Sequence, residues 1–138
     1  MNIKKYISTL SKQSLLSSNK SGTYTSSQKN NTLRTVARNL KSDTKKILDD
    51  RIELTATCVR IPVLVSHAES VNIEFEKSLN LEKINSLLNN AKGCKVYDKR
   101  EDRGYMTASE AEGKNETYIS RIREKKKKKN TINMWIVS

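Results

Sequence analysis

The rare reactive side chains of this sequence gather in one stretch, TATCVRIPVLVSHAES, which spans residues 55–70. It contains the only histidine, His67, the only proline, Pro62, an arginine, Arg60, and one of the two cysteines, Cys58. A neutral imidazole can accept and donate protons near pH 7. A planar guanidinium can hold a carboxylate through two parallel hydrogen bonds. The residues alone leave two interpretations open, an acid–base and carboxylate-binding site or an ordinary packed strand.

The spacing of the two candidate residues sets a condition on the fold. In a straight strand, the seven residues from Arg60 to His67 would span about 23 Å. A shared pocket therefore requires the chain to bend between them. Pro62 is a natural place for this, because proline removes a ladder donor and forces a strand to bend, to end or to run along a sheet edge.

Other kinds of chemistry lack the residues they need. Cys58 and Cys94 form no CxxC pair, and a single histidine cannot complete a zinc site with them, so we expect two buried thiols and no metal. The four glycines, at 22, 93, 104 and 113, are too far apart for a GxGxxG turn or a phosphate-binding loop. We therefore expect no nucleotide to bind this chain alone.

The elements that must position these residues can be read from hydrophobic periodicity. Alternation predicts strands over 52–58 and 71–76, and an amphipathic helix follows over 80–93, with Asn80 as N-cap and Gly93 as the stop. A short strand is expected over 94–98. Two further strands, TYISRIRE and TINMWIVS, flank a lysine run and predict a hairpin. The expected fold class is α+β, a mixed and mostly antiparallel sheet with a covering helix.

The charge of the chain is uneven. Residues 1–42 contain eight of the 27 Lys and Arg residues and none of the 15 acidic ones. Their Ser, Asn, Thr and Lys content predicts a disordered basic tail, with a marginal helix near 33–48, ahead of a domain at 43–138. The lysine run would bind polyanions without specificity, so no specific nucleic acid is expected. The longest apolar run, IPVLV, cannot span a membrane, and we expect a cytoplasmic protein.

Several spaced motifs closely resemble the C-terminal domain of bacterial aspartate-semialdehyde dehydrogenases. The first is DTKKILDDRIELTATCVRIPVLVSHAESVNIEFEK, and YMTASEAEGKNETYISRIRE and NTINMWIVS follow in the same order as in that family. The resemblance covers residues 43–138. It implies the dehydrogenase C-terminal fold and its role in substrate binding and dimerisation.

The family reaction is the NADPH-dependent reduction of β-aspartyl phosphate to aspartate β-semialdehyde, which serves lysine, diaminopimelate, methionine and threonine synthesis. By resemblance, the carboxylate-binding arginine of the family falls on Arg60 of CVRIP. The acid–base histidine falls on His67 of VSHAE. The expected partners are this small-molecule substrate and a second subunit.

The sequence also departs from the family pattern. The nucleophilic cysteine of the family stands in an Asn-Cys-x-Thr context that neither cysteine here provides, and the glycine-rich dinucleotide-binding half is missing. A Glu-x-x-Lys pair expected before TKKIL is absent from RTVARNLKS, and Ala108 replaces a proline. We therefore expect a truncated domain that binds no NADP and is inactive alone. The alternative is an interaction module that pairs with itself or with an intact subunit.

Overall fold

The computed structural model describes residues 3–13, 26–61, 63–128 and 130–138. The elements follow one another along the chain as β1 (Ile3–Gln13), α1 (Ser26–Ile47), β2 (Glu53–Ile61), β3 (Ala68–Phe75), α2 (Leu81–Asn90), β4 (Cys94–Val96), α3 (Ala108–Ala111), β5 (Thr117–Glu124) and β6 (Thr131–Val137).

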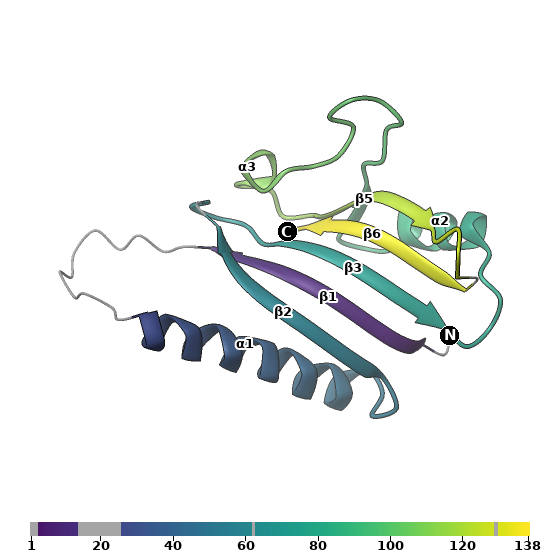
Figure 1. The fold of residues 1–138 in the computed structure, drawn as a ribbon. Coiled ribbons are helices and arrows are strands. Elements are labelled where there is room, and N and C mark those ends of the chain that lie inside the picture. The colour runs from purple at the N-terminus through teal and green to yellow at the C-terminus, as the bar shows by residue number, and fades with distance from the viewer. Residues whose placement is uncertain (1–2, 14–25, 62, 129) are drawn as a thin grey trace.

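The strands form one six-stranded sheet in the order β2-β1-β3-β6-β5-β4 (Figure 1). The β1–β2 and β4–β5 pairs are parallel, and the three pairs between them are antiparallel. This arrangement confirms the predicted α+β class with a mixed, mostly antiparallel sheet. The predicted hairpin is also confirmed, because β5 and β6 pair with each other on either side of the lysine run.

Helix α2 covers one face of the sheet and closes the main core. Its buried residue Ile84 packs with apolar side chains of β3, β5 and β6, which are Val71, Phe75, Ile119, Ile122, Ile132 and Met134. Burying a side chain of this size contributes about 1.5–3 kcal/mol to the free energy of unfolding. The predicted N-cap is confirmed, because the Asn80 side chain accepts a hydrogen bond from the Lys83 N–H at 2.8 Å. The helix ends earlier than predicted, at Asn90 with Ala91 as C-cap, and Gly93, at a φ of +76°, lies in the turn that follows.

A second apolar cluster lies under the short helix α3. The hydrophobic periodicity of the sequence did not predict this helix. Its buried members come from α3, the loop before it and strands β3, β5 and β6, and they are Ala68, Met106, Ala108, Ala111, Tyr118 and Val137. Four residues are too few to show a helical period. A local signal was present, because TASE is a capping-box sequence: Thr107 and Glu110 bond to each other's backbone N–H.

The N-terminal segment differs from the expectation of a disordered tail. Residues 3–13 form β1, which lies between β2 and β3 and pairs with both. Residues 26–47 form α1, so the helix predicted near 33–48 is confirmed and begins earlier. The physical reason is that the ladder partners of β1 lie more than 40 residues away in sequence, where local periodicity cannot reveal them. Residues 14–25 of the predicted tail lie outside the described residues.

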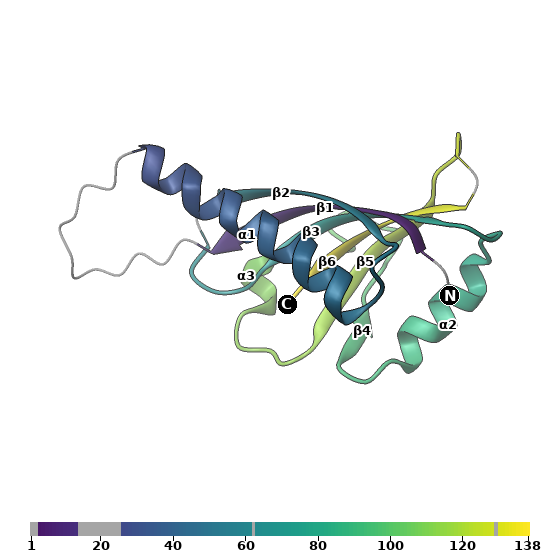
Figure 2. The ribbon, with the colours of Figure 1, turned by 90° about the horizontal axis from the view of Figure 1, so that it is seen from below.

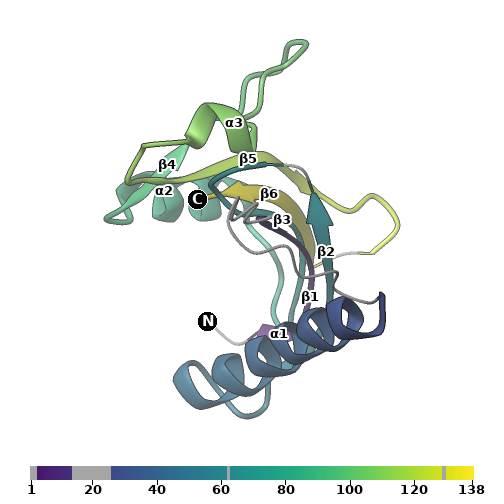
Figure 3. The same cartoon turned by 90° about the vertical axis from the view of Figure 1, so that its left-hand side faces the viewer.

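The two long helices flank different parts of the curved sheet. Helix α1 runs alongside β2 (Figure 2), and α2 lies near β4 at the other end of the strand order (Figure 3). Helix α2 packs on the first apolar cluster, and α3 with the loop before it packs on the second. No helix among the described residues is long and apolar enough to cross a membrane.

Candidate functional site

Arg60 lies on strand β2, one residue before the strand ends at Ile61. Strand β2 is at the edge of the sheet, and its only partner in the sheet order is β1. Both observations agree with the prediction that a strand must end or run along an edge at Pro62. Pro62 itself lies outside the described residues.

His67 lies directly before β3, in a backbone position fixed by the end of β6. Its N–H donates to the Ser138 carbonyl at 2.6 Å, and its own carbonyl accepts from the Ser138 N–H at 3.0 Å. The hydroxyl of Ser66 donates to the same Ser138 carbonyl at 2.7 Å, with Ser66 at a φ of 90°. The side chain of His67 is half-buried. The histidine backbone is therefore held in place.

The register of the sheet brings the backbones of Arg60 and His67 to one end of the sheet. Arg60 is opposite Lys12 of β1, and Ser11 of β1 is opposite Ala68 of β3. Because His67 directly precedes Ala68, the backbones of Arg60 and His67 lie on opposite sides of the same end of β1. Two strand spacings correspond to about 10 Å. The required reversal between the two residues is thus present, and their use of a common pocket stays a prediction.

The two cysteines lie far from each other. Cys58 is on β2 and Cys94 on β4, which are the two opposite edges of the sheet, about 24 Å apart at the usual strand spacing. Both side chains are half-buried, which agrees with packed thiols better than with an exposed nucleophile. Among the described residues, no group of three or more His, Cys, Asp and Glu side chains gathers as a metal site would require.

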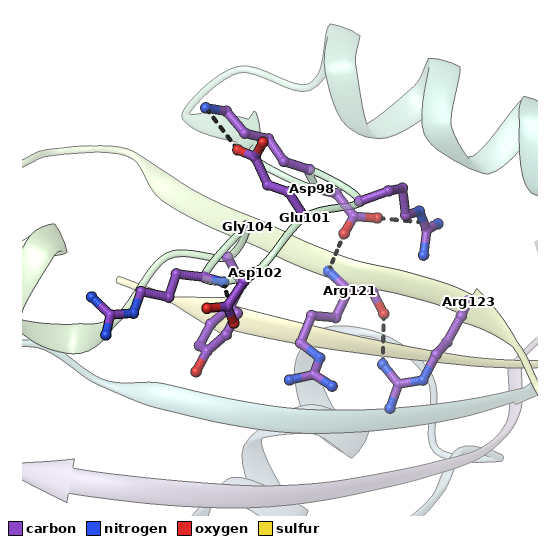
Figure 4. Close-up of a pocket in the computed structure, with 10 residues that line it drawn as sticks. Asp98, Glu101, Asp102, Gly104, Arg121 and Arg123 are labelled. Carbon is purple, nitrogen blue, oxygen red and sulfur yellow. Dashed lines mark hydrogen bonds and ion pairs between the residues drawn. The ribbon is translucent and has the colours of Figure 1, made fainter.

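The structure also contains an arginine-rich cleft that the sequence interpretation missed. It has a volume of about 330 Å³ and lies between the loop after β4 and strand β5 (Figure 4); its lining residues are Asp98, Lys99, Arg100, Glu101, Asp102, Arg103, Gly104, Tyr105, Arg121 and Arg123. A second cleft of about 280 Å³ shares Tyr105, Arg121 and Arg123 with it. A signal was present in the sequence, because the arginines of SRIRE are two residues apart and side chains at that spacing share a face of a strand.

Strand β5 is irregular at this point. The pairing with β6 shifts register between Ser120 and Arg123, and Arg121 has a φ of 53°, in the left-handed region. A non-glycine residue in this region costs about 1–2 kcal/mol. The carboxylate of Asp98 compensates, since it accepts hydrogen bonds from the N–H groups of Arg121 at 2.7 Å and Ile122 at 3.1 Å. The bulge and the loop therefore stabilise each other.

Comparison with known proteins identifies the domain. The family model described as "Semialdehyde dehydrogenase, dimerisation domain" matches residues 12–138, so the match begins inside the segment that we expected to be a tail. The aspartate-semialdehyde dehydrogenase of Rickettsia bellii is 37% identical over 92 residues, which are 67% of this chain and 27% of that protein. The enzyme of Aquifex aeolicus is 38% identical over 97 residues, 70% of this chain and 28% of that protein.

Solved structures show the same fold. Aspartate semialdehyde dehydrogenase II from Vibrio cholerae, solved in complex with ASA, superimposes with a TM-score of 0.80 at 23% identity, over 99% of this chain and 49% of that one. The Candida albicans enzyme, solved with NADP, gives a TM-score of 0.63 at 20% identity, over 99% of this chain and 45% of that one.

The chain thus spans less than a third of the length of the curated relatives it matches. The motifs around Arg60 and His67 lie within the matched residues, and the observed sheet is the one that the solved enzymes contain. The chain belongs to the semialdehyde dehydrogenase dimerisation-domain family, and its relatives there are aspartate-semialdehyde dehydrogenases.

Proposed function

We propose that this chain provides the substrate-binding and dimerisation part of an aspartate-semialdehyde dehydrogenase. The reaction would be the NADPH-dependent reduction of β-aspartyl phosphate to aspartate β-semialdehyde, in the cytoplasmic synthesis of lysine, threonine and methionine. The observation that carries the proposal is the family match over residues 12–138. The sheet register supports it, because Arg60 pairs with Lys12 of β1 and Ala68, the residue after His67, pairs with Ser11.

Arg60 and His67 would have different roles in this reaction. The guanidinium of Arg60 would bind the substrate carboxylate through paired, charge-assisted hydrogen bonds. The imidazole of His67 would transfer a proton to or from the reacting carbonyl group, which is a function suited to a group that titrates near neutral pH. The backbone bonds from His67 to Ser138 would fix the backbone from which the imidazole projects.

The described residues do not fit a bound dinucleotide. Gly93 and Gly113 have positive φ values where α2 and α3 end, so they serve as helix-stop residues. A Cβ on Gly104 would lie 2.3 Å from the Lys99 carbonyl oxygen, so this glycine closes a turn. None of the three forms a cradle for phosphate groups. We therefore propose that NADP does not bind these residues alone.

The 138 residues also lack a nucleophile in the required context. Acyl transfer through a thioester needs an activated thiolate, and the two half-buried cysteines lie on opposite sheet edges. We propose that the chain by itself does not complete the reaction. Growth of a strain that lacks the enzyme, after expression of this chain alone and without added diaminopimelate, would contradict this.

Substrate recognition can be tested directly on the chain. Titration with aspartate β-semialdehyde, followed by NMR, should give saturable shifts near His67. Arg60→Ala should weaken binding about tenfold or more, because a hydrogen bond to a charged group contributes about 1.5–3 kcal/mol. Lys83→Ala is the matched control, since it removes one positive charge from the exposed surface of α2. Equal affinity of the Arg60→Ala variant and the parent chain would refute the role of Arg60.

The second candidate function is an interaction module, and the observation that favours it is the family description itself, a dimerisation domain. The chain would then pair with itself or with an intact subunit. Size-exclusion chromatography over a concentration series should show a dimer that forms as concentration rises. A monomer at every concentration that also captures no intact enzyme would exclude this function.

A further inference from the structure

Two arginines of strand β5 face both clefts described above without a carboxylate partner. Arg121 and Arg123 line the larger and the smaller cleft, and neither guanidinium forms an ion pair with the described residues. One nitrogen of Arg123 donates to the Arg121 carbonyl at 2.8 Å, and the Arg121 guanidinium lies 5.3 Å from the ring centre of Tyr105. Each guanidinium has five N–H donors, so most of them remain for a ligand in the clefts that these side chains line.

The acidic residues of the larger cleft bind groups other than the guanidinium groups of Arg121 and Arg123. Asp98 accepts the two backbone N–H groups of the β5 bulge and lies 3.5 Å from Arg100, while Glu101 pairs with Lys99 at 3.4 Å. Asp102 accepts the N–H of the next residue at 3.1 Å. Five basic and three acidic side chains line the cleft. The excess positive charge therefore remains at the arginines that face the open space.

The backbone conformation at Arg121 sets the direction in which its side chain points. Its φ of 53° is unusual for a residue other than glycine, and bulges of this kind redirect a side chain. Such backbone outliers concentrate at functional sites. The Asp98 carboxylate holds the bulge in place, so the direction of Arg121 is fixed before any ligand arrives.

The remaining wall of the smaller cleft includes one fixed aromatic ring and one hydroxyl group. The Trp135 indole N–H donates to the Met106 carbonyl at 2.9 Å, which fixes the ring, and Ser70 adds a hydroxyl. We propose that Arg121 and Arg123 form a binding site for a small oxyanion, a phosphate or a carboxylate group, in these joined clefts. Guanidinium pairs match the planar, multidentate geometry of such groups. This inference does not rest on the proposed function, because His67 lines neither cleft.

The test is an amide NMR titration of the full chain at constant ionic strength, with inorganic phosphate in one arm and succinate in the other. Saturable shifts at residues 98–105 and 121–123 are expected in at least one arm, and the arm with the higher affinity identifies the anion. Chloride at the same ionic strength should give no saturable change.

Substitutions can distinguish the contribution of the guanidinium groups from that of the backbone bulge. Arg121→Gly removes the side chain while glycine accepts the left-handed φ, so the bulge should persist. This variant and Arg123→Lys should each weaken binding about tenfold, as expected for lost charge-assisted hydrogen bonds. Lys83→Ala, on the exposed surface of α2, should keep the parent affinity. A lack of saturable shifts in both arms, or unchanged affinity of a folded double variant Arg121→Gly with Arg123→Ala, would overturn the proposal.

Discussion

Asp98 links the loop after β4 to the bulge in β5 through a single carboxylate. It is largely shielded from water, with a side-chain exposure of 12%, and its two oxygens accept the N–H groups of Arg121 and Ile122. A carboxylate can accept two such bonds at once, whereas an amide has only one accepting oxygen. An asparagine of the same size could therefore not make both hydrogen bonds with separate oxygens.

Asp98→Asn should lower the free energy of unfolding by about 2 kcal/mol, because hydrogen bonds to charged groups contribute about 1.5–3 kcal/mol and the new NH₂ group would face an N–H donor. Urea denaturation measures the change as a lower midpoint at an unchanged slope. Asp102→Asn is the control, since that exposed carboxylate accepts only the adjacent N–H. Equal midpoints for the two variants would show that the Asp98 bonds contribute little.

At the scale of elements, short helices depend on their caps more than on their length. In α3, the Thr107 hydroxyl and N–H both donate to the Glu110 carboxylate, at 2.6 and 2.9 Å. These hydrogen bonds lower the pKa of Glu110 below its ordinary value near 4.5, with the hydroxyl as the larger cause. The stability that they supply is present above that pH and is lost as the pH falls through the lowered pKa.

Thr107→Ala should cost about 1 kcal/mol of stability near neutral pH, as loss of an N-cap usually does. The difference between this variant and the parent should shrink well below pH 4.5, because protonation of Glu110 weakens the same bonds in the parent. Urea denaturation at both pH values measures this. Thr55→Ala, on the exposed side of β2, is the control that should show no such pH dependence. A difference that stays constant with pH would argue against the Glu110 contribution.

The elements with a strong local signal were predicted correctly. Strands β2 and β3 alternate apolar and polar residues, β5 and β6 are rich in β-branched and aromatic residues, and α2 has both its apolar stripe and its Asn80 cap. The signals that failed were those without local periodicity, namely β1 and the four-residue α3. A strand between two neighbours gains backbone hydrogen bonds on both sides, so it needs less of an alternating side-chain pattern to form.

For the whole molecule, the important difference between expectation and structure lies in residues 3–13. Because they form β1, their amides should exchange with solvent at rates close to those of β3, since both strands lie inside the sheet. Hydrogen exchange followed by NMR or mass spectrometry measures this. The exposed turn residues Lys126 and Lys127 provide the fast-exchanging reference. Exchange of residues 3–13 at the rate of this turn would restore the interpretation of a disordered tail.

The sequence by itself determined the family, the fold class and most of the sheet, because the motifs CVRIP and VSHAE and the strand periodicities are local properties of the chain. It also named Arg60 and His67 as the candidate pair. Only the tertiary structure shows that the strand carrying Arg60 and the strand that follows His67 lie on either side of β1. The arginine-lined clefts likewise depend on Asp98 reaching a bulge 23 residues further along the chain. Contacts of this range leave no periodic mark in the sequence, and therefore no local pattern predicts them.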